Sequence, residues 1–571
     1  MNTQNRRLIQ TFWVLAVALG VLQTWTVRDT FDADGISYLD LGDACARGDW
    51  TATINAHWSP LYPCLLGVTA RLTKPTPYWE FTVVHLVNFA IFLLTLFCFN
   101  LFLRDLILYN RHIISATPGD ENSALPTAAW LALGYSLFIS SALVMINIKS
   151  VSPDMAVAGL VYLASSILLR IYMRTTGWPI FVLQGIVLGV GYLTKAVMFP
   201  LAFVFLSVSL FAVRNFRVAI SRVLLASAVF VVMTLPFVTA LSQAKGRLTI
   251  SDSPRLNYAI YVNGVSIYDH WQGEPPGTGK PLHPTRKIFN RPAVYEFGTP
   301  IQATYAPWYD QSYWNEGIVL HFDFKQQLWR LAANIMVYLD VLTRPTILMI
   351  VGFLLLCMMA NKSLTPVKAI ADNWVLLVPA LLALVMYSLV VVTTRYVGPF
   401  LVLLCSGVGC GVRLLNSQSK RLVAQASMAT LILVAVSIST DLLQSVTSEF
   451  VTKNIQSHLH WYVAEGLKSV GIRRGDKVAF IGDSHFAYWA RLARVRISAE
   501  IPLRNIDEFV SSDPTVKSEV FKVLAGTGAR LVVTDQTAVY ASTNGWQRIG
   551  NTDHYYVHML TGLDTENSPR S

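Results

Sequence analysis

Charged residues are scarce in this chain. Of its 571 residues only 14% are Asp, Glu, Lys or Arg, whereas 53% are hydrophobic and the mean hydropathy is +0.45. A soluble domain of ordinary composition carries about 25% charged residues, so this composition excludes that class. Heptads, solenoid repeats and low-complexity tracts are also missing from the sequence. What remains is the composition of a polytopic membrane protein.

A separate basic domain is missing as well. The net charge is +11, but the Lys and Arg residues lie in short clusters between apolar runs. We therefore interpret the charge as a topology signal and expect no nucleic-acid partner. The first apolar run, Leu8 to Val27, follows Arg6 and Arg7 and ends without an obvious small-residue cleavage site. This pattern favours a retained first helix over a signal peptide.

Apolar stretches of roughly 17 to 25 residues predict eleven transmembrane helices. They lie near 8–27, 81–103, 125–147, 154–172, 178–194, 196–213, 223–242, 345–360, 374–392, 397–415 and 423–443. A cytoplasmic N-terminus places the following basic residues inside, as the positive-inside rule requires: Arg104, Arg111, Arg170, Arg174, Arg214, Arg217, Arg222, Lys362, Lys368, Arg413, Lys420 and Arg421.

Three polar regions then fall outside. Two are loops of the transmembrane domain (residues 1–444), at 28–80 and 243–343, and the third is residues 445–571. In this last region "KVAFIGDSH", "VRISAEI" and "ARLVVTD" are typical of short buried strands, with "FAYWARLAR" and "PTVKSEVFKVLA" as helices between them. The fold class is therefore an α-helical membrane protein with a small outer α/β domain.

Six cysteines are present, and four of them lie in apolar runs. Cys45 and Cys64 lie together in the first outer loop. They form a disulfide if that loop faces an oxidising compartment, and an unpaired pair of thiols is the alternative.

Several charges are not explained by topology. Lys149, Lys195 and Arg395 lie at the outer ends of spans, where a cation at membrane depth is costly and suggests a functional partner. Carboxylates occur on the same face, at Asp32, Asp34 and Asp154. Such a set suits sugar transfer from a polyprenyl-phosphate sugar: the cations neutralise the lipid phosphate, and a carboxylate takes the proton of the acceptor.

The same residues lie in five blocks that resemble membrane-embedded GT-C glycosyltransferases, the group with protein O-mannosyltransferases and the lipid A aminoarabinose transferase. Asp34-Gly35-Ile36-Ser37-Tyr38 is similar to the acidic D-E-A-x-Y segment, and His57-Trp58-Ser59-Pro60-Leu61-Tyr62-Pro63 to H-P-P-L-Y. Ser152-Pro153-Asp154 resembles the P-D turn, Gly191-Tyr192-Leu193-Thr194-Lys195 the G-x-x-L-T-K segment, and Arg395-Tyr396-Val397-Gly398-Pro399 the late R-Y-x-x-P. The resemblance covers residues 8 to 415.

The resemblance implies a role for each matching position. Asp34 would be the general base, Lys195 and Arg395 would bind the donor phosphate, and Asp154 would support the sugar or orient a cation. His57, Tyr38 and Tyr396 belong to the same blocks and are expected to bind substrate. The family often has Glu where this chain has Gly35, so Asp32 or Asp40 would supply the second carboxylate, and either Asp32 or Asp34 would be the base.

Simpler interpretations accompany these roles. Asp32 and Asp34 can be a solvated turn or a helix cap, and Asp-x-Asp can also hold a divalent metal ion. Lys149 and Lys195 can reach lipid head groups, and His57 can be a hydrogen-bonding loop residue. Aromatic residues in the long outer loop can stack on sugars or pack the loop onto the membrane; they are Tyr258, Tyr261, Tyr268, Trp271, Trp308, Tyr309, Tyr313 and Trp314.

Gly482-Asp483-Ser484-His485 looks like the nucleophile block of SGNH esterases. Those enzymes need a late D-x-x-H segment. The late candidates pair Asp553 with His554, which is adjacent, or with His558, which is too far along. We expect this turn to end a strand in a domain that binds acceptor or partner.

The sequence therefore predicts an integral glycosyltransferase of a bacterial inner membrane, with a cytoplasmic N-terminus and a periplasmic or extracellular C-terminal domain. It would move a sugar from a polyprenyl phosphate to a hydroxyl or amine on lipid, glycan or protein. Direct displacement by the acceptor would invert the anomeric configuration. The alternatives are a transporter or flippase of lipid-linked sugars and an inactive structural subunit.

Overall fold

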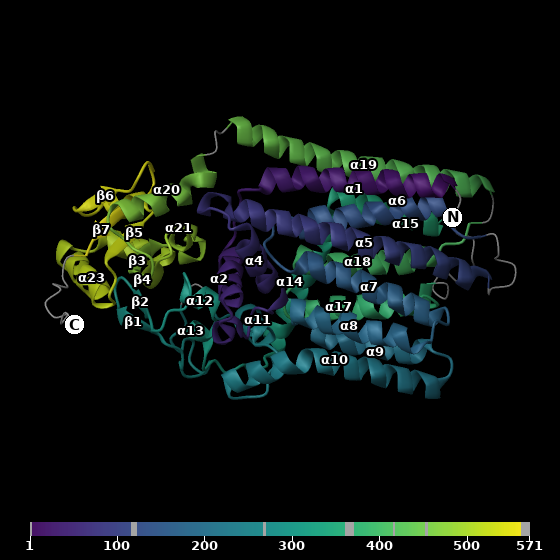
Figure 1. The fold of residues 1–571 in the computed structure, drawn as a ribbon, viewed down its shortest axis with the longest axis horizontal. Helices are drawn as coiled ribbons and strands as arrows, with labels where there is room; N and C mark the ends of the chain where they lie inside the picture. Colours follow the sequence, from purple (N-terminus) through teal and green to yellow (C-terminus); the bar gives the residue numbers. More distant parts are fainter. Residues whose placement is uncertain are drawn as a thin grey trace.

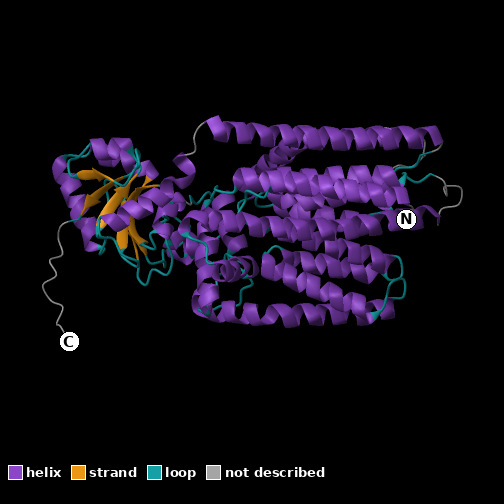
Figure 2. Cartoon of the chain, turned by 45° about the horizontal axis from the view of Figure 1, so that its top comes forward, coloured by secondary structure: helices purple, strands orange, loops and turns teal. Residues whose placement is uncertain are grey.

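The protein is mainly helical, with a small sheet at one end of a long helix bundle (Figures 1 and 2). The computed structural model describes residues 3–115, 123–266, 270–359, 370–414, 417–451 and 455–560. Lys362 and Lys368 lie outside these residues. The first helix begins at the end of the bundle far from the sheet (Figure 1).

Apolar helices form the bundle, and each expected span has a counterpart. They are α1 (Thr3–Val27), α5 (Glu80–Ser115), α6 (Thr127–Ile139) continuing into the wider turns of η2 (Ser140–Ile146), α7 (Asp154–Tyr172), α8 (Trp178–Thr194), α9 (Met198–Ala212), α10 (Phe216–Lys245), α14 (Phe324–Thr343), α15 (Pro345–Met359), α17 (Trp374–Ser388), α18 (Thr394–Cys410) and α19 (Ser417–Val451).

Within the described residues, six helices are long and apolar enough to cross a membrane. The α14–α15 pair passes the same test but bends by 79° at its break, and α8, α9, α17 and α18 are shorter apolar helices. The chain is therefore an integral membrane protein with the helical membrane architecture that the sequence predicted. Such segments form helices because a chain in lipid must satisfy its own backbone hydrogen bonds.

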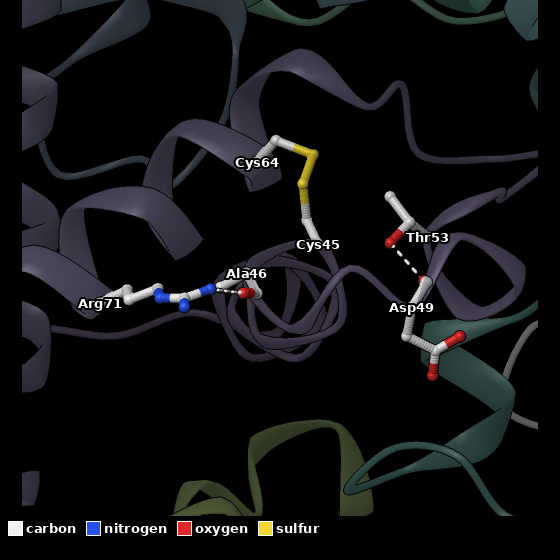
Figure 3. Close-up of a disulfide and its surroundings, with 6 residues drawn as sticks. All are labelled: Cys45, Ala46, Asp49, Thr53, Cys64 and Arg71. Carbon is white, nitrogen blue, oxygen red and sulfur yellow. Dashed lines mark hydrogen bonds between the residues drawn. A yellow bond between two sulfur atoms is a disulfide. The ribbon is translucent and has the colours of Figure 1, made fainter.

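The first outer region folds into helices rather than an open loop. It contains α2 (Ala33–Arg47), α3 (Trp50–Thr53), α4 (Leu61–Thr73) and the short η1 (Pro77–Trp79). Helices α2 and α4 approach so closely that a Cβ on Gly67 would lie 2.0 Å from the Gly42 carbonyl oxygen. Beside this contact, a disulfide joins Cys45 to Cys64 (Figure 3). Of the two alternatives left open by the sequence, the protein has the disulfide.

The second outer region contributes short elements that cover the outer end of the bundle. They are α11 (Ser253–Tyr261), β1 (Thr285–Phe289), β2 (Val294–Phe297), α12 (Ala306–Tyr309) and α13 (Ser312–Asn315). After the bundle come α20 (Ile455–Ser469), β3 (Lys477–Gly482), η3 (Ser484–Phe486), α21 (Tyr488–Leu492), β4 (Arg496–Pro502), η4 (Leu503–Asn505), α22 (Ile506–Ser511), α23 (Pro514–Gly526), β5 (Leu531–Thr534), α24 (Thr537–Ala541), β6 (Trp546–Arg548) and β7 (Tyr556–Met559).

The sheet has the strand order β1-β2-β4-β3-β5-β7-β6. Its centre, β4-β3-β5, is parallel and consists of the three strands that the sequence predicted, while the flanking pairs are antiparallel. Side chains of β3 alternate between two cores: Val478 and Phe480 join the main core, and Ala479 and Ile481 a second one. A strand covered on both faces is apolar throughout, as "VAFI" is. The sequence did not anticipate β1 and β2, which extend this sheet from the second outer region.

A buried set of charges fastens the sheet to the bundle. Arg491 on α21 is only 1% exposed and bonds Asp40 at 2.5 Å, Glu80 at 2.8 Å and Asp43 at 3.2 Å. We refer to these four residues as the junction cluster. Asp40 also accepts hydrogen bonds from the Thr304 backbone N–H and hydroxyl. Helix α2 is therefore tied at its middle to the sheet, which fixes the direction of its N-terminus.

Candidate active site

The two aspartates at the start of α2 have different environments. Asp32 is the N-cap of the helix: Oδ1 accepts a hydrogen bond from the Gly35 N–H at 2.6 Å, and Oδ2 accepts one from the Val151 N–H at 3.0 Å. Burial, followed by the charge of Asp34, raises the pKa of Asp32 to about 6. The cap interpretation is confirmed for Asp32, whose two oxygens are both occupied by backbone donors.

Gly35 is explained by the same cap. A Cβ at this position would lie 2.9 Å from Asp32 Oδ1 and 3.1 Å from both the Phe81 ring and Val151 Cβ. Glu cannot be accommodated here without displacing the cap. Asp40, the other residue considered as a second carboxylate, belongs to the junction cluster and does not line the site.

Asp34 belongs to a different group of charges. Its Oδ2 lies 3.2 Å from an Arg395 guanidinium nitrogen, and Asp154 Oδ2 lies 3.4 Å from Arg395 Nε. Lys195 Nζ forms an ion pair with the other oxygen of Asp154. We refer to Asp34, Asp154, Lys195 and Arg395 as the cavity cluster. It brings together the start of α2, the start of α7, the end of α8 and the start of α18.

The partners of the cavity cluster hold its cations in place. Asp154 is 3% exposed and accepts a further hydrogen bond from the Ser152 hydroxyl at 2.9 Å. Lys195 Nζ lies 3.8 Å from the centre of the Tyr396 ring, which stacks on Tyr387. Cations held by a carboxylate and an aromatic face are positioned before any ligand arrives.

Tyr38 and His57 complete the set that the sequence singled out. Tyr38, one turn after Asp34, packs edge-on against Trp58 and Tyr62. The pKa of Tyr38 is well above its usual value because the phenol is buried and Asp34 is close, so the phenol stays neutral. His57 Nδ1 lies 3.0 Å from the Ser253 hydroxyl.

The proton positions on His57 follow from its hydrogen bonds. We assign the single Ser253 hydroxyl proton to the His57 carbonyl at 2.9 Å, the shorter of its two contacts, which makes Nδ1–H the donor to the Ser253 oxygen at 3.0 Å. Burial, with a smaller effect of Lys195, lowers the pKa of His57 to about 3. The ring is therefore neutral at pH 7, and its Nε2 is a hydrogen-bond acceptor.

A cavity of about 500 Å³ lies at the cavity cluster. Its lining includes every substrate or catalytic residue expected from the sequence except Asp32: Asp34, Tyr38, His57, Asp154, Lys195, Arg395 and Tyr396. One part of the wall is apolar and comes from the bundle, with Phe199, Pro200, Met386, Val390 and Val391. This volume is typical of a site for a small organic ligand. The exposed Lys149 does not line the cavity.

The sequence missed residues that the second outer region contributes. Ser253, Asn257, Tyr261, Trp308 and Gln311 all line the cavity. Only the two aromatic residues among them had been considered, and as alternatives to loop packing. Trp271 does not line the cavity and is buried in a small apolar cluster within the second outer region. Tyr268 lies outside the described residues.

The environment of the Asp-x-Asp pair does not fit a chelating metal site. Both oxygens of Asp32 face backbone N–H donors, and Asp34 faces a guanidinium. Within the part of the chain that the structure describes, no group of three or more His, Cys, Asp and Glu side chains is placed to hold a metal ion. Positive charge beside Asp34 comes from Arg395, while Lys195 is paired with Asp154.

The Gly482-Asp483-Ser484-His485 turn follows β3, as the sequence predicted. Asp483 accepts hydrogen bonds from the His485 backbone and ring. The buried Ser484 hydroxyl has no hydrogen-bond partner among the described residues. The His485 ring packs edge-on against Tyr305 and Trp308. A serine nucleophile activated by histidine is therefore not assembled here.

Known proteins with a similar fold are found among solved structures. No family model matches the chain, and no curated protein matches it. Among solved structures it is similar to ArnT from Cupriavidus metallidurans in the apo state, with 14% identity and a TM-score of 0.50 over 95% of this chain and 97% of that one. For ArnT from the same organism bound to undecaprenyl phosphate, the identity is 13% and the TM-score 0.48, over 98% of this chain and 99% of that one. For an Archaeoglobus fulgidus oligosaccharyltransferase in complex with Zn and sulfate, the identity is 12% and the TM-score 0.47, over 92% of this chain and 68% of that one.

The likeness to apo ArnT extends over nearly the whole of both chains. ArnT is the lipid A aminoarabinose transferase, a GT-C glycosyltransferase. The chain therefore has the GT-C fold, and the resemblance that the sequence blocks indicated is confirmed at this level. At 14% identity the likeness concerns the fold and leaves the substrates to be argued from the site.

Proposed function

We propose that the protein is a glycosyltransferase that moves a sugar from a polyprenyl phosphate to an acceptor nucleophile. The observation that carries the proposal is the cavity cluster: two cations and two carboxylates at a cavity whose bundle side is apolar. An isoprenoid chain suits the apolar wall, and a phosphate suits Lys195 and Arg395. The GT-C fold supports the same class of enzyme.

The reaction follows from what these groups can do. Asp34 accepts the proton of an acceptor hydroxyl or amine while that atom forms its bond to the anomeric carbon. The bond between the anomeric carbon and the phosphate oxygen breaks, and its electron pair leaves with the polyprenyl phosphate. Attack opposite the leaving group inverts the anomeric configuration, and no covalent enzyme intermediate forms.

The two cations stabilise the negative charge of the leaving phosphate. Arg395 and Lys195 neutralise the departing phosphate, and a well-placed donor of this kind contributes on the order of 10² to 10³ in rate. Asp154 orients both cations by its ion pairs with them. Phosphate binding to Arg395 would draw the guanidinium away from Asp34, which frees the carboxylate to act as a base. Asp32 is the helix cap that holds Asp34 in position.

We propose that the cavity faces the periplasm of a bacterial inner membrane, with the N-terminus in the cytoplasm. The Cys45–Cys64 disulfide supports this orientation because disulfides persist in oxidising compartments. We further propose that the transmembrane unit ends near residue 444 and that residues 445–571 form an outer domain, to which β1 and β2 add two strands.

The test is consumption of donor. Purified protein is incubated with undecaprenyl-phosphate sugars labelled in the sugar, and release of undecaprenyl phosphate is followed by thin-layer chromatography in the presence of bacterial envelope lipids and glycans. The proposal predicts time-dependent release and a labelled product. A transporter or an inactive subunit would bind the lipid and leave it intact, which would overturn the proposal.

A further inference from the structure

The outer wall of the cavity contains a buried amide with no partner. Gln311 is only 4% exposed, and it lines the cavity. Neither its Nε2 nor its Oε1 makes a hydrogen bond with any residue that the structure describes. A buried polar atom without a partner destabilises the protein, so an amide in this state is suited to pair with a ligand.

Two aromatic residues stand with Gln311 at this wall. The Trp308 indole lies against Trp58 and lines the cavity, and its Nε1–H also makes no hydrogen bond within the described residues. His57, whose Nε2 is an acceptor, lines the same cavity. The wall therefore offers an indole face and N–H, an amide that both donates and accepts, and an imidazole acceptor. Hydroxyl groups, which donate and accept, pair with all of these.

Negative charge is lacking at this wall. Among the described residues that line the cavity, the carboxylates are Asp34 and Asp154, and each is paired with Arg395. When phosphate binding draws Arg395 away from Asp34, that carboxylate is committed to the proton of the acceptor, so an ammonium group of an amino sugar would find no carboxylate left to pair with at this wall. A desolvated ammonium without a counter-charge is far more costly than a hydroxyl, because hydroxyls are satisfied by neutral partners.

We propose that Trp308, Gln311 and His57 form a subsite for a neutral, hydroxylated sugar ring and select against amino sugars. This inference rests on the proposed function, because it assigns a ligand to the same cavity. The ring stacks on the indole, and its hydroxyls bond the Gln311 amide and His57 Nε2. The sugar belongs either to the donor or to a glycan acceptor.

Binding of three kinds of lipid tests the subsite in the full-length protein. The probes are undecaprenyl phosphate, its glucose, mannose and galactose derivatives, and its 4-amino-4-deoxyarabinose derivative. If the subsite holds the donor sugar, wild-type protein is expected to bind at least one neutral derivative ten-fold or more tighter than undecaprenyl phosphate, and the amino-sugar derivative no tighter. Gln311→Leu should remove this ten-fold gain and leave the affinity for undecaprenyl phosphate within two-fold.

Two further variants separate recognition from folding. Gln326→Leu makes the same change at an exposed residue and should alter none of these affinities. Gln311→Glu places a carboxylate at the subsite and should reverse the preference toward the amino-sugar derivative, an effect that misfolding cannot produce. A thermal unfolding curve of each variant shows whether the fold is retained.

The source of the sugar is distinguished by a second titration. Protein loaded with undecaprenyl phosphate is titrated with a soluble gluco-oligosaccharide. A Gln311→Leu effect on the lipid-linked sugars assigns the subsite to the donor, and an effect confined to the oligosaccharide assigns it to the acceptor.

Three results would overturn the inference: tighter binding of the amino-sugar lipid by wild-type protein, no effect of Gln311→Leu in either titration, or, where the titrations assign the subsite to the donor, no reversal with Gln311→Glu. Wild-type protein that bound none of the lipids would overturn the proposed function as well, so the two failures are distinguishable.

Discussion

Helix α2 contributes carboxylates to two clusters of charges: the junction cluster has one cation and three carboxylates, and the cavity cluster has two of each. The junction cluster contains Arg491 at 1% exposure, bonded to three carboxylates, and none of its residues lines the cavity. In the cavity cluster, Arg395 is 27% exposed and Asp34 is 21% exposed, and both line the cavity. One cluster joins two parts of the molecule, while the other leaves its charges accessible to a ligand.

The difference shows that residue type alone does not identify a site. In both clusters the charged side chains form ion pairs and therefore affect one another. Access to a ligand separates them: a fully enclosed arginine stabilises the native arrangement, whereas a partly open one can exchange a carboxylate for a phosphate. We therefore expect changes in the junction cluster to affect folding and changes in the cavity cluster to affect turnover.

Arg491→Met should produce the largest loss of stability. It removes the cation that joins Asp40, Asp43 and Glu80 and leaves only the partly exposed Arg494 beside Asp43 and Glu80; breaking a buried pair in this way costs about 3–5 kcal/mol. Thermal unfolding in detergent measures the effect. Arg530→Met is the matched control: Arg530 is 48% exposed in its pair with Asp476, and its loss should cost less than about 1 kcal/mol. Equal shifts for the two variants would contradict the comparison.

Arg395→Gln should lower turnover by about 10² to 10³, because one cation facing the leaving phosphate is lost. Its effect on the unfolding midpoint should be small beside that of Arg491→Met. The measurement is the initial rate of donor consumption at saturating donor. Lys149→Gln removes an exposed cation that does not line the cavity and should leave the rate unchanged. A rate loss shared by both variants would indicate a general charge effect instead of a site.

The Cys45–Cys64 disulfide, which follows the junction cluster along α2, should contribute about 3 kcal/mol, since it closes a loop with a sequence separation of 19. Replacing Cys45 and Cys64 by Ser should lower the unfolding midpoint. Adding reductant to wild-type protein should produce the same shift and have no effect on the double variant. If reductant shifts both proteins equally, the shift does not come from this bond.

Asp32 should make a smaller, pH-dependent contribution. Its folded pKa of about 6 lies above the usual value of 3.8, so the folded state binds this proton more tightly than the unfolded state. The resulting stability is fully present below about pH 4 and is lost as the pH rises through about 6. We expect wild-type protein to lose about 1–3 kcal/mol relative to Asp32→Asn across this range. Parallel stability curves for the two proteins would contradict this assignment.

The sequence predicted what depends on local pattern. Long apolar runs gave the helices of the bundle, and short apolar runs gave β3, β4 and β5. It missed β1 and β2 because both strands are short and partly polar; β1 pairs with β2 in the same loop, and β2 pairs with β4, about 200 positions away. The pairing of β2 with so distant a strand leaves no periodic pattern in the local sequence.

The two aspartates illustrate the same limit within the site. Asp32 and Asp34 look equivalent in the sequence, and the Val151 N–H, 119 positions away, makes one of them a cap. Gln311 carried no signal at all, because a neutral amide in a loop becomes informative only when its burial is known. The cysteine pair was left open because sequence does not give the redox compartment; the helix packing that places their Cα atoms 5.4 Å apart was also not predictable.

The central claim is that Asp34 is the base and Asp32 its structural support. The most direct test compares Asp34→Asn with Asp32→Asn in donor consumption and in binding of undecaprenyl phosphate. Loss of a general base should lower turnover by about 10² to 10⁴ in Asp34→Asn with lipid binding retained, while Asp32→Asn stays within about ten-fold of wild type. Full activity in Asp34→Asn, or the larger loss in Asp32→Asn, would contradict the account.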